Sequence, residues 1–186
     1  MDIEIDKQVL SLGMRFYARA LMYPYDELTY EFQSLYRDLE KCISSDADNT
    51  IAVKILDVIN FYQGEDMIGL QSEFVRLFTP RDDQAPFVSL NIQDLNPQVP
   101  LEELLDELEE DPLFKEVEDE PELAPYIMEH FSSMLEFEED ERIEAFYSSY
   151  LKEGLNVLAE SVFNATTLNF YKEFGKGLSE MVQLLD

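Results

Sequence analysis

The chain has 186 residues, with 13 lysine and arginine residues against 41 aspartate and glutamate residues, so its formal net charge is −28 at pH 7. Such a charge repels nucleic-acid phosphates and anionic lipid headgroups, which disfavours DNA, RNA and membrane-surface binding. It favours a cationic partner, in particular a peptide that bears arginine or lysine. Hydrophobic residues make up 46% of the chain and aromatic residues 12%. We therefore expect a folded globular protein rather than a disordered acidic chain.

The single cysteine and the N-terminal residues favour a cytoplasmic protein. Cys42 has no second cysteine with which to form an internal disulfide, and it lies in a helical pattern typical of a small core residue. No apolar run approaches the roughly 18 residues that a membrane-spanning helix needs. The segment 1–4 reads MDIE and is acidic where a signal peptide would be basic. We predict a soluble, cytoplasmic chain without direct membrane insertion.

Apolar residues recur at helical spacing along most of the chain. In the first part they predict four helices, with apolar faces within residues 9–20, 28–43, 51–62 and 70–78. Pro24 ends the first of these helices and Pro80 the fourth, because proline cannot continue a helix. The last third predicts further helices within residues 126–135, 143–158 and 167–185. No stretch alternates with period two for long enough to predict a strand.

Residues 80–125 break this pattern and predict an acidic, proline-rich connector. Four prolines fall within residues 80–100, and a short leucine-bearing helix follows at 101–108. Residues 102–122 hold twelve acids and one base, Lys115, and further prolines interrupt them.

We predict a single all-α domain over residues 1–186, a helical bundle of about seven or eight helices. The connector or hinge at 80–125 divides it into helical halves at about 1–79 and 126–186. A connector of this length allows a monomer or a domain-swapped dimer.

The composition argues against an enzyme. His130 is the only histidine, so neither a zinc site nor a pair of Glu-x-x-His motifs for two irons is available. Six scattered glycines form no phosphate-binding loop, and no acidic run has the spacing of a calcium loop. We predict no catalytic residue, no metal and no cofactor. His130 is expected at the edge of the core, and the acidic runs are expected to be solvated helix faces.

Residues 70–89 resemble a known family. The segment 70–78 reads LQSEFVRLF and is followed at 86–89 by PFVS, which resembles the E-x-x-R-L-F and P-x-x-S stretch of the TorD/DmsD/NarJ-like chaperones. These are cytoplasmic maturation proteins of molybdenum-cofactor oxidoreductases. Segments 15–24, 145–151 and 165–178 resemble other helices of the family. The likeness covers almost the whole chain.

The hinge departs from the family pattern. The family has E-P-D-H or P-D-H before an apolar helix, whereas residues 120–127 read EPELAPYI, so that Pro125 and Tyr126 stand at the Asp and His positions. A role that needs the hinge histidine, including weak nucleotide binding, is therefore not carried over to this chain.

The resemblance implies a chaperone that holds the twin-arginine leader peptide, and sometimes the apo catalytic subunit, of a molybdoenzyme until its cofactor is inserted. By resemblance the peptide-binding residues lie in the hinge and in the earlier motif: Glu120, Pro125, Tyr126, Glu129, His130, Glu73, Arg76, Pro86 and Ser89. A purely structural alternative stands beside this hypothesis. Glu73 and Arg76 are three apart on a helix and can pair with each other, while the proline and serine can shape the loop and the tyrosine can pack.

Two other functions compete with this one. An acidic decoy that covers a basic nucleic-acid-binding surface would also explain the charge, but not the order of the family-like segments. An enzyme with a carboxylate-only site is the weakest candidate, because the usual ligand and nucleophile sets are missing.

Overall fold

The computed structural model describes residues 5–111 and 120–186. Within these ranges every regular element is a helix and no strand forms, which confirms the predicted all-α class. In chain order the elements are α1 (Lys7–Ala20), α2 (Leu28–Glu40), α3 (Asp46–Gly64), α4 (Met67–Phe78), α5 (Ile92–Leu95), α6 (Leu101–Glu109), α7 (Ala124–Phe137), α8 (Asp140–Phe146), the π-helix η2 (Tyr147–Leu151), α9 (Lys152–Ala165) and α10 (Asn169–Leu185).

The number of helices agrees with the sequence pattern. The elements α8, η2 and α9 run without a break from residue 140 to residue 165. If this long helix is counted once and the four-residue α5 is left out, the described residues hold eight helices. The π-helical turn inside the long helix was not predicted.

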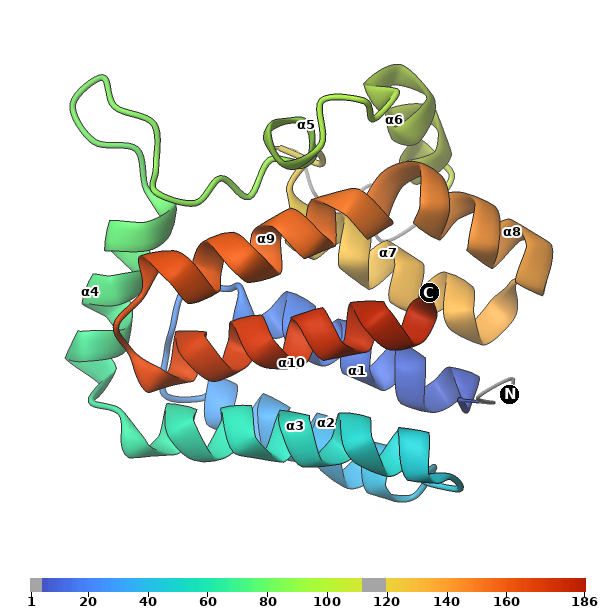
Figure 1. Cartoon of the computed structure of the whole chain (residues 1–186), viewed down its shortest axis with the longest axis horizontal. Helices are drawn as coiled ribbons and strands as arrows, with labels where there is room; N and C mark the ends of the chain where they lie inside the picture. The colour runs from blue at the N-terminus through green and yellow to red at the C-terminus, as the bar shows by residue number, and fades with distance from the viewer. Residues whose placement is uncertain (1–4, 112–119) are drawn as a thin grey trace.

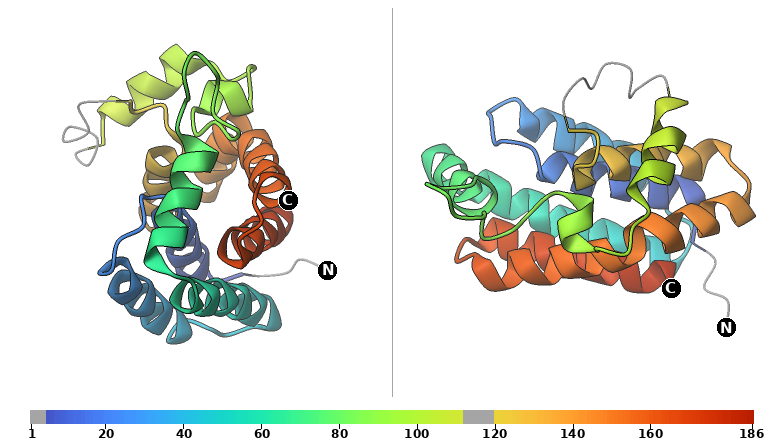
Figure 2. Two further views of the ribbon diagram at one scale, coloured as in Figure 1. Left: turned by 90° about the vertical axis from the view of Figure 1, so that its left-hand side faces the viewer. Right: turned by 90° about the horizontal axis from the view of Figure 1, so that it is seen from above.

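The helices of the two predicted halves pack against each other in one core. Helix α1 contacts α7 and α2, and α10 lies between α9 and α3 (Figure 1). Helix α4 stands across one end of these helices, while α5 and α6 lie outside them along one edge (Figures 1 and 2). In its described part, residues 80–111 and 120–125, the segment that was predicted as a connector thus contributes the predicted helix α6 and the short helix α5, which was not predicted; residues 112–119, with Lys115, lie outside the described residues.

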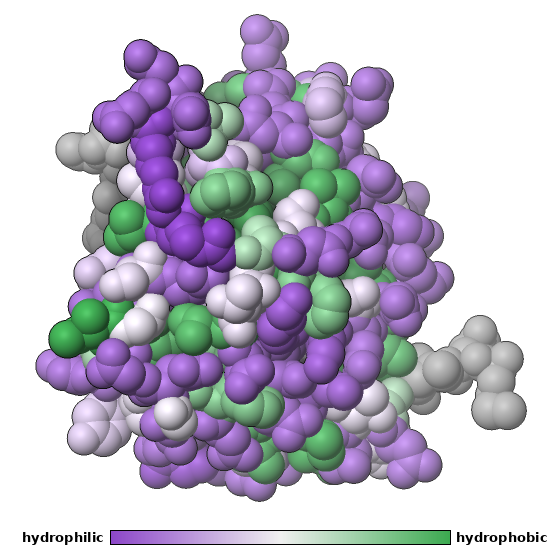
Figure 3. Space-filling model, turned by 60° about the vertical axis from the view of Figure 1, so that its left-hand side comes forward, coloured by the Kyte–Doolittle hydropathy of each residue, from purple (hydrophilic) through white to green (hydrophobic). Residues whose placement is uncertain are grey.

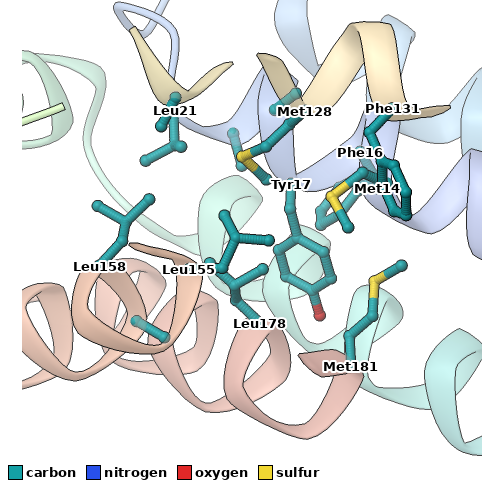
Figure 4. Close-up of a cluster of buried hydrophobic side chains, with 14 of the residues drawn as sticks. Met14, Phe16, Tyr17, Leu21, Met128, Phe131, Leu155, Leu158, Leu178 and Met181 are labelled. Atoms are coloured by element: carbon teal, nitrogen blue, oxygen red, sulfur yellow. The ribbon is translucent and has the colours of Figure 1, made fainter. Parts of the chain in front are cut away.

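The centre of the core is apolar and aromatic. Tyr17 and Met14 from α1, Met128 from α7, and Leu178 and Met181 from α10 point toward one another (Figure 4). A chain of tilted and edge-to-face aromatic contacts extends from this centre toward α4, through Phe16, Phe32, Tyr62, Phe170, Tyr171 and Phe78. Such contacts add roughly 0.5–1.5 kcal/mol each beyond burial.

A buried carboxylate joins the beginnings of α1 and α3. Asp48 accepts hydrogen bonds from the backbone N–H groups of Asp6, Ser44 and Ser45 at 2.9–3.0 Å. The Ser45 hydroxyl in turn accepts from the Asp48 N–H, which completes a capping box. Burial alone would raise the pKa of Asp48, but the hydrogen bonds that it accepts outweigh burial and lower it.

Helices α9 and α10 approach each other closely at a glycine. A Cβ atom at Gly175 would lie 2.8 Å from the Ala159 carbonyl oxygen and 2.9 Å from Cβ of Phe163. A carbonyl in the middle of a helix cannot rotate away as a flexible side chain can. Glycine is therefore required here by the packing of two backbones, not by its own backbone conformation.

Replacing Gly175 with alanine should lower the stability of the protein. The clash with the α9 backbone costs roughly 1–3 kcal/mol, which exceeds the gain of about 1 kcal/mol in helix propensity. The matched control is Gly64→Ala, because a Cβ at Gly64 meets nothing within 4 Å. Thermal unfolding followed by circular dichroism should show a lower Tm for the first variant and an unchanged or higher Tm for the second. Equal shifts in the two variants would contradict the close approach.

Candidate functional site

Two of the residues named by resemblance form a structural ion pair. Arg76 donates from Nε and Nη2 to the two carboxylate oxygens of Glu73, at 2.9 and 2.7 Å. The Thr166 hydroxyl donates to the same carboxylate at 2.8 Å, and Arg76 also donates to the carbonyl of Ala165. The pair thus holds α4 against the turn between α9 and α10. The predicted pairing of these two residues with each other is observed.

The other residues of the earlier motif lie in the loop after α4. Pro86 is half-buried there. Ser89 donates its hydroxyl hydrogen to Asp94 at 2.6 Å and accepts from the Asn91 N–H at 3.1 Å. These bonds shape the loop that leads into the short helix α5, whose N-cap residue is Asn91. Phe87, between them, is exposed and lies under the Arg76 guanidinium at 5.2 Å.

The structure brings this loop beside the hinge. The Ala124 N–H donates to the Leu90 carbonyl at 2.7 Å, and the Ile92 N–H donates to the Glu122 carbonyl at 2.9 Å. Two segments about thirty residues apart in the sequence are therefore joined directly before α7 begins. Glu120, at the start of the hinge, is exposed and has a left-handed φ of 62°, which is uncommon for glutamate.

The remaining hinge residues lie along α7 and face different ways. Pro125 is buried in the first turn of the helix, where its missing N–H has no intrahelical partner to lose. Tyr126 is half-buried. Glu129 pairs with Arg19 of α1 at 2.8 Å. His130 faces another side, toward α6, where its Nδ1 lies 2.6 Å from the carboxylate of Asp111.

His130 lines a groove between α6 and the helices α7, α8 and η2. Two adjacent cavities of about 420 and 310 Å³ lie there and share Glu107, Glu110 and Arg142. We call the two together the acidic groove. Its remaining lining residues are Asp106, Asp111, His130, Ser133, Met134, Phe137, Glu138, Ala145, Phe146, Ser149 and Tyr150. Figures 1 and 2 show α6 above α7 and the long helix that begins with α8.

The groove is strongly acidic on its α6 side. Helix α6 has acidic residues throughout and no basic residue in its last turn. Carboxylates near a helix C-terminus are unfavourable by roughly 0.3–1 kcal/mol each, because the helix dipole is negative there. Among the described residues that line the groove, only Arg142 and His130 are basic. The placement of these acids therefore opposes helix stability and favours a nearby cation.

The opposite side of the groove carries apolar side chains, which we call the apolar wall, among the polar Ser133, Glu138 and Ser149. Phe137 is 81% exposed at the end of α7. Met134 lines the same cavity and Phe146 lines the neighbouring one, and both are almost fully buried. Tyr150 of the π-helical turn faces the acids of α6: burial raises the pKa of its hydroxyl, and the charges of Glu107 and Glu103 raise it further. An apolar wall facing a row of carboxylates suits a ligand with both a cationic and an apolar part.

Two other surfaces fit such a ligand less well. A cavity of about 460 Å³ on the other side of α8 is lined mainly by apolar residues, and two of its three lining acids, Asp140 and Asp186, are paired with lysines. Ile68 of α4 is 72% exposed. On this side of the molecule, hydrophobic surface residues are interspersed with hydrophilic ones (Figure 3).

Comparison with protein-family models, with curated proteins and with solved structures finds no match for the chain. Within residues 5–111 and 120–186, no three His, Cys, Asp or Glu side chains are grouped so as to hold a metal ion. No helix in these ranges combines the length and apolar character needed to cross a membrane.

Replacing Glu73 with glutamine should destabilise the protein by about 1–3 kcal/mol, because Arg76 and Thr166 lose their charged partner in a buried site. The hydrogen bond from Arg76 lowers the pKa of Glu73 in spite of burial. The ionised Glu73–Arg76 pair therefore stabilises the fold at neutral pH, and this stabilisation is lost as the pH falls below about 4. Urea unfolding at pH 7 and pH 3 should show a difference between wild type and variant that shrinks at the lower pH. A difference independent of pH would contradict the ionised pair.

Proposed function

We propose that this protein is a peptide-binding chaperone, and that the acidic groove holds an arginine-bearing, partly apolar segment of its client. The observation that supports this proposal is the pairing of α6 carboxylates with an apolar wall across one groove. Together with the family resemblance of the sequence, it favours as client the twin-arginine leader of a molybdoenzyme precursor in the cytoplasm.

The chemistry of such a leader matches the two sides of the groove. A guanidinium group is planar and always charged, and it can donate two parallel hydrogen bonds to one carboxylate. Glu107 and Glu110 stand one turn apart at the end of α6 and are shared by both cavities. The apolar residues that follow an arginine pair would lie against Phe137 and its neighbours.

The two parts of the ligand would contribute differently to binding. A solvent-exposed ion pair contributes only about 0–1 kcal/mol. Buried apolar surface contributes roughly 25 cal/mol per Å², so contact with the apolar wall supplies most of the affinity. The carboxylates mainly raise the association rate and select the cationic ligand.

Isothermal titration calorimetry with twin-arginine leader peptides tests the proposal. Three peptides are compared: the natural sequence, a variant with lysines in place of the arginine pair, and a variant whose apolar segment is made polar. We expect saturable binding of the first, weaker binding of the second and none of the third. Binding that depends only on net peptide charge would instead favour the acidic decoy, and no binding of any leader would contradict the proposal.

The double variant Glu107→Gln/Glu110→Gln locates the site. It should weaken the arginine peptide roughly three- to thirtyfold, since it removes two exposed charge pairs of up to about 1 kcal/mol each. The control is Glu27→Gln/Glu160→Gln, which makes the same charge change at exposed positions outside the lining of the groove. Equal loss of binding in the two double variants would mean that the groove is not the site.

A further inference from the structure

Arg142 lies where a peptide arginine would bind. Its guanidinium is 3.1 Å from the carboxylate of Glu138 and 3.5 Å from that of Glu107, so it spans the groove from α8 to α6. It also belongs to the lining of both cavities. In the free protein the guanidinium of Arg142 thus already lies among these carboxylates, next to the apolar wall.

The helix that carries Arg142 does not account for this placement. Arg142 is the third residue of α8, close to the helix N-terminus. The helix dipole is positive there and disfavours a cation, just as its negative end disfavours the acids at the end of α6. Arg142 in α8 and the acids at the end of α6 are thus each unfavourable within their own helix, and Arg142 meets Glu107 across the groove. Their mutual attraction offsets part of both costs.

The arginine is held loosely enough to be displaced. Its side chain is 50% exposed, and the carboxylates of Glu107 and Glu138 are 23% and 35% exposed. Ion pairs this exposed contribute about 0–1 kcal/mol each. A buried and fully hydrogen-bonded guanidinium, such as that of a structural network, would cost far more to move.

Among its described lining residues the groove also has more acids than bases. Asp106, Glu107, Glu110 and Glu138 line it together with Arg142, which pairs with Glu107 and Glu138, while His130 is engaged with Asp111. A peptide guanidinium that displaces Arg142 gains the carboxylates of Glu107 and Glu138 and lies beside the further acids of the groove.

We propose that Arg142 is an internal competitor for the guanidinium position of the acidic groove. Its side chain occupies that position in the free protein and leaves when a peptide arginine enters. Arg142 therefore lowers the affinity of the groove for every arginine-bearing peptide, and only a client with enough further contacts binds. This inference rests on the proposed function. It adds that the site is partly occupied by the protein's own arginine, and that this residue opposes binding instead of supporting it.

The test compares wild type with Arg142→Gln and Arg142→Ala. The probe is a synthetic peptide with an arginine pair followed by a short leucine- and alanine-rich segment, titrated by calorimetry at fixed ionic strength. Both variants should bind it roughly three- to tenfold more tightly, since the peptide no longer has to displace an ion-paired side chain. The glutamine variant keeps most of the side-chain volume, so it separates charge removal from the opening of space.

The matched control is Arg37→Ala on α2, which changes the net charge by the same amount. Arg37 is exposed and outside the groove, and its Nε donates to the Gln33 carbonyl. This variant should bind the peptide as wild type does. A similar tightening in it would mean that net charge alone is responsible, and the inference would be overturned.

The other outcomes separate the two proposals. If wild type binds the peptide and the Arg142 variants bind it equally or more weakly, the competitor role is wrong while the proposed function stands. If neither wild type nor any variant binds, the proposed function fails and the inference fails with it.

Discussion

Repulsion among carboxylates is the constraint that the structure has to satisfy, since acids outnumber bases by 28 in a chain of 186 residues. Most of the few cations join one helix to another. Arg15 and Arg19 of α1 reach acids on α7, Lys54 of α3 reaches α10, and Arg76 helps to hold α4 against the turn before α10. Helix α6 is different, because its many acids face a groove with only two basic side chains among its described lining residues. We interpret this local excess as the part of the charge that serves binding.

The fold class could be predicted because helical periodicity is a local property of the sequence. Proline positions and apolar spacing located most helices, including the long one that contains Phe146 and Leu158. Periodicity could not reveal the π-helical turn at Tyr147–Leu151, which keeps the helix continuous. It also could not reveal that α9 and α10 touch at Gly175, because that contact depends on tertiary packing.

The candidate site was only partly visible in the sequence. The spacing of Glu73 and Arg76 indicated their pairing, but not the contact with the α9–α10 turn that gives the pair its structural role. His130 was among the predicted residues and lines the groove. The acids of α6 were interpreted as a solvated face, because nothing in the local sequence shows which surface lies opposite them. Arg142 was missed, and its position near the start of an acidic helix is the one signal that could have singled it out.

The most direct test of this account is to locate the bound peptide on the protein. A leader peptide with a photoreactive residue beside its arginine pair is cross-linked to the full chain, and the modified residues are identified by mass spectrometry. The account predicts cross-links in the acidic groove, at Met134, Phe137 and Tyr150, which disappear when unlabelled peptide is added in excess. Cross-links at Ile68 and Val75 of α4, or at Leu135 and Leu184 in the cavity beyond α8, would contradict it.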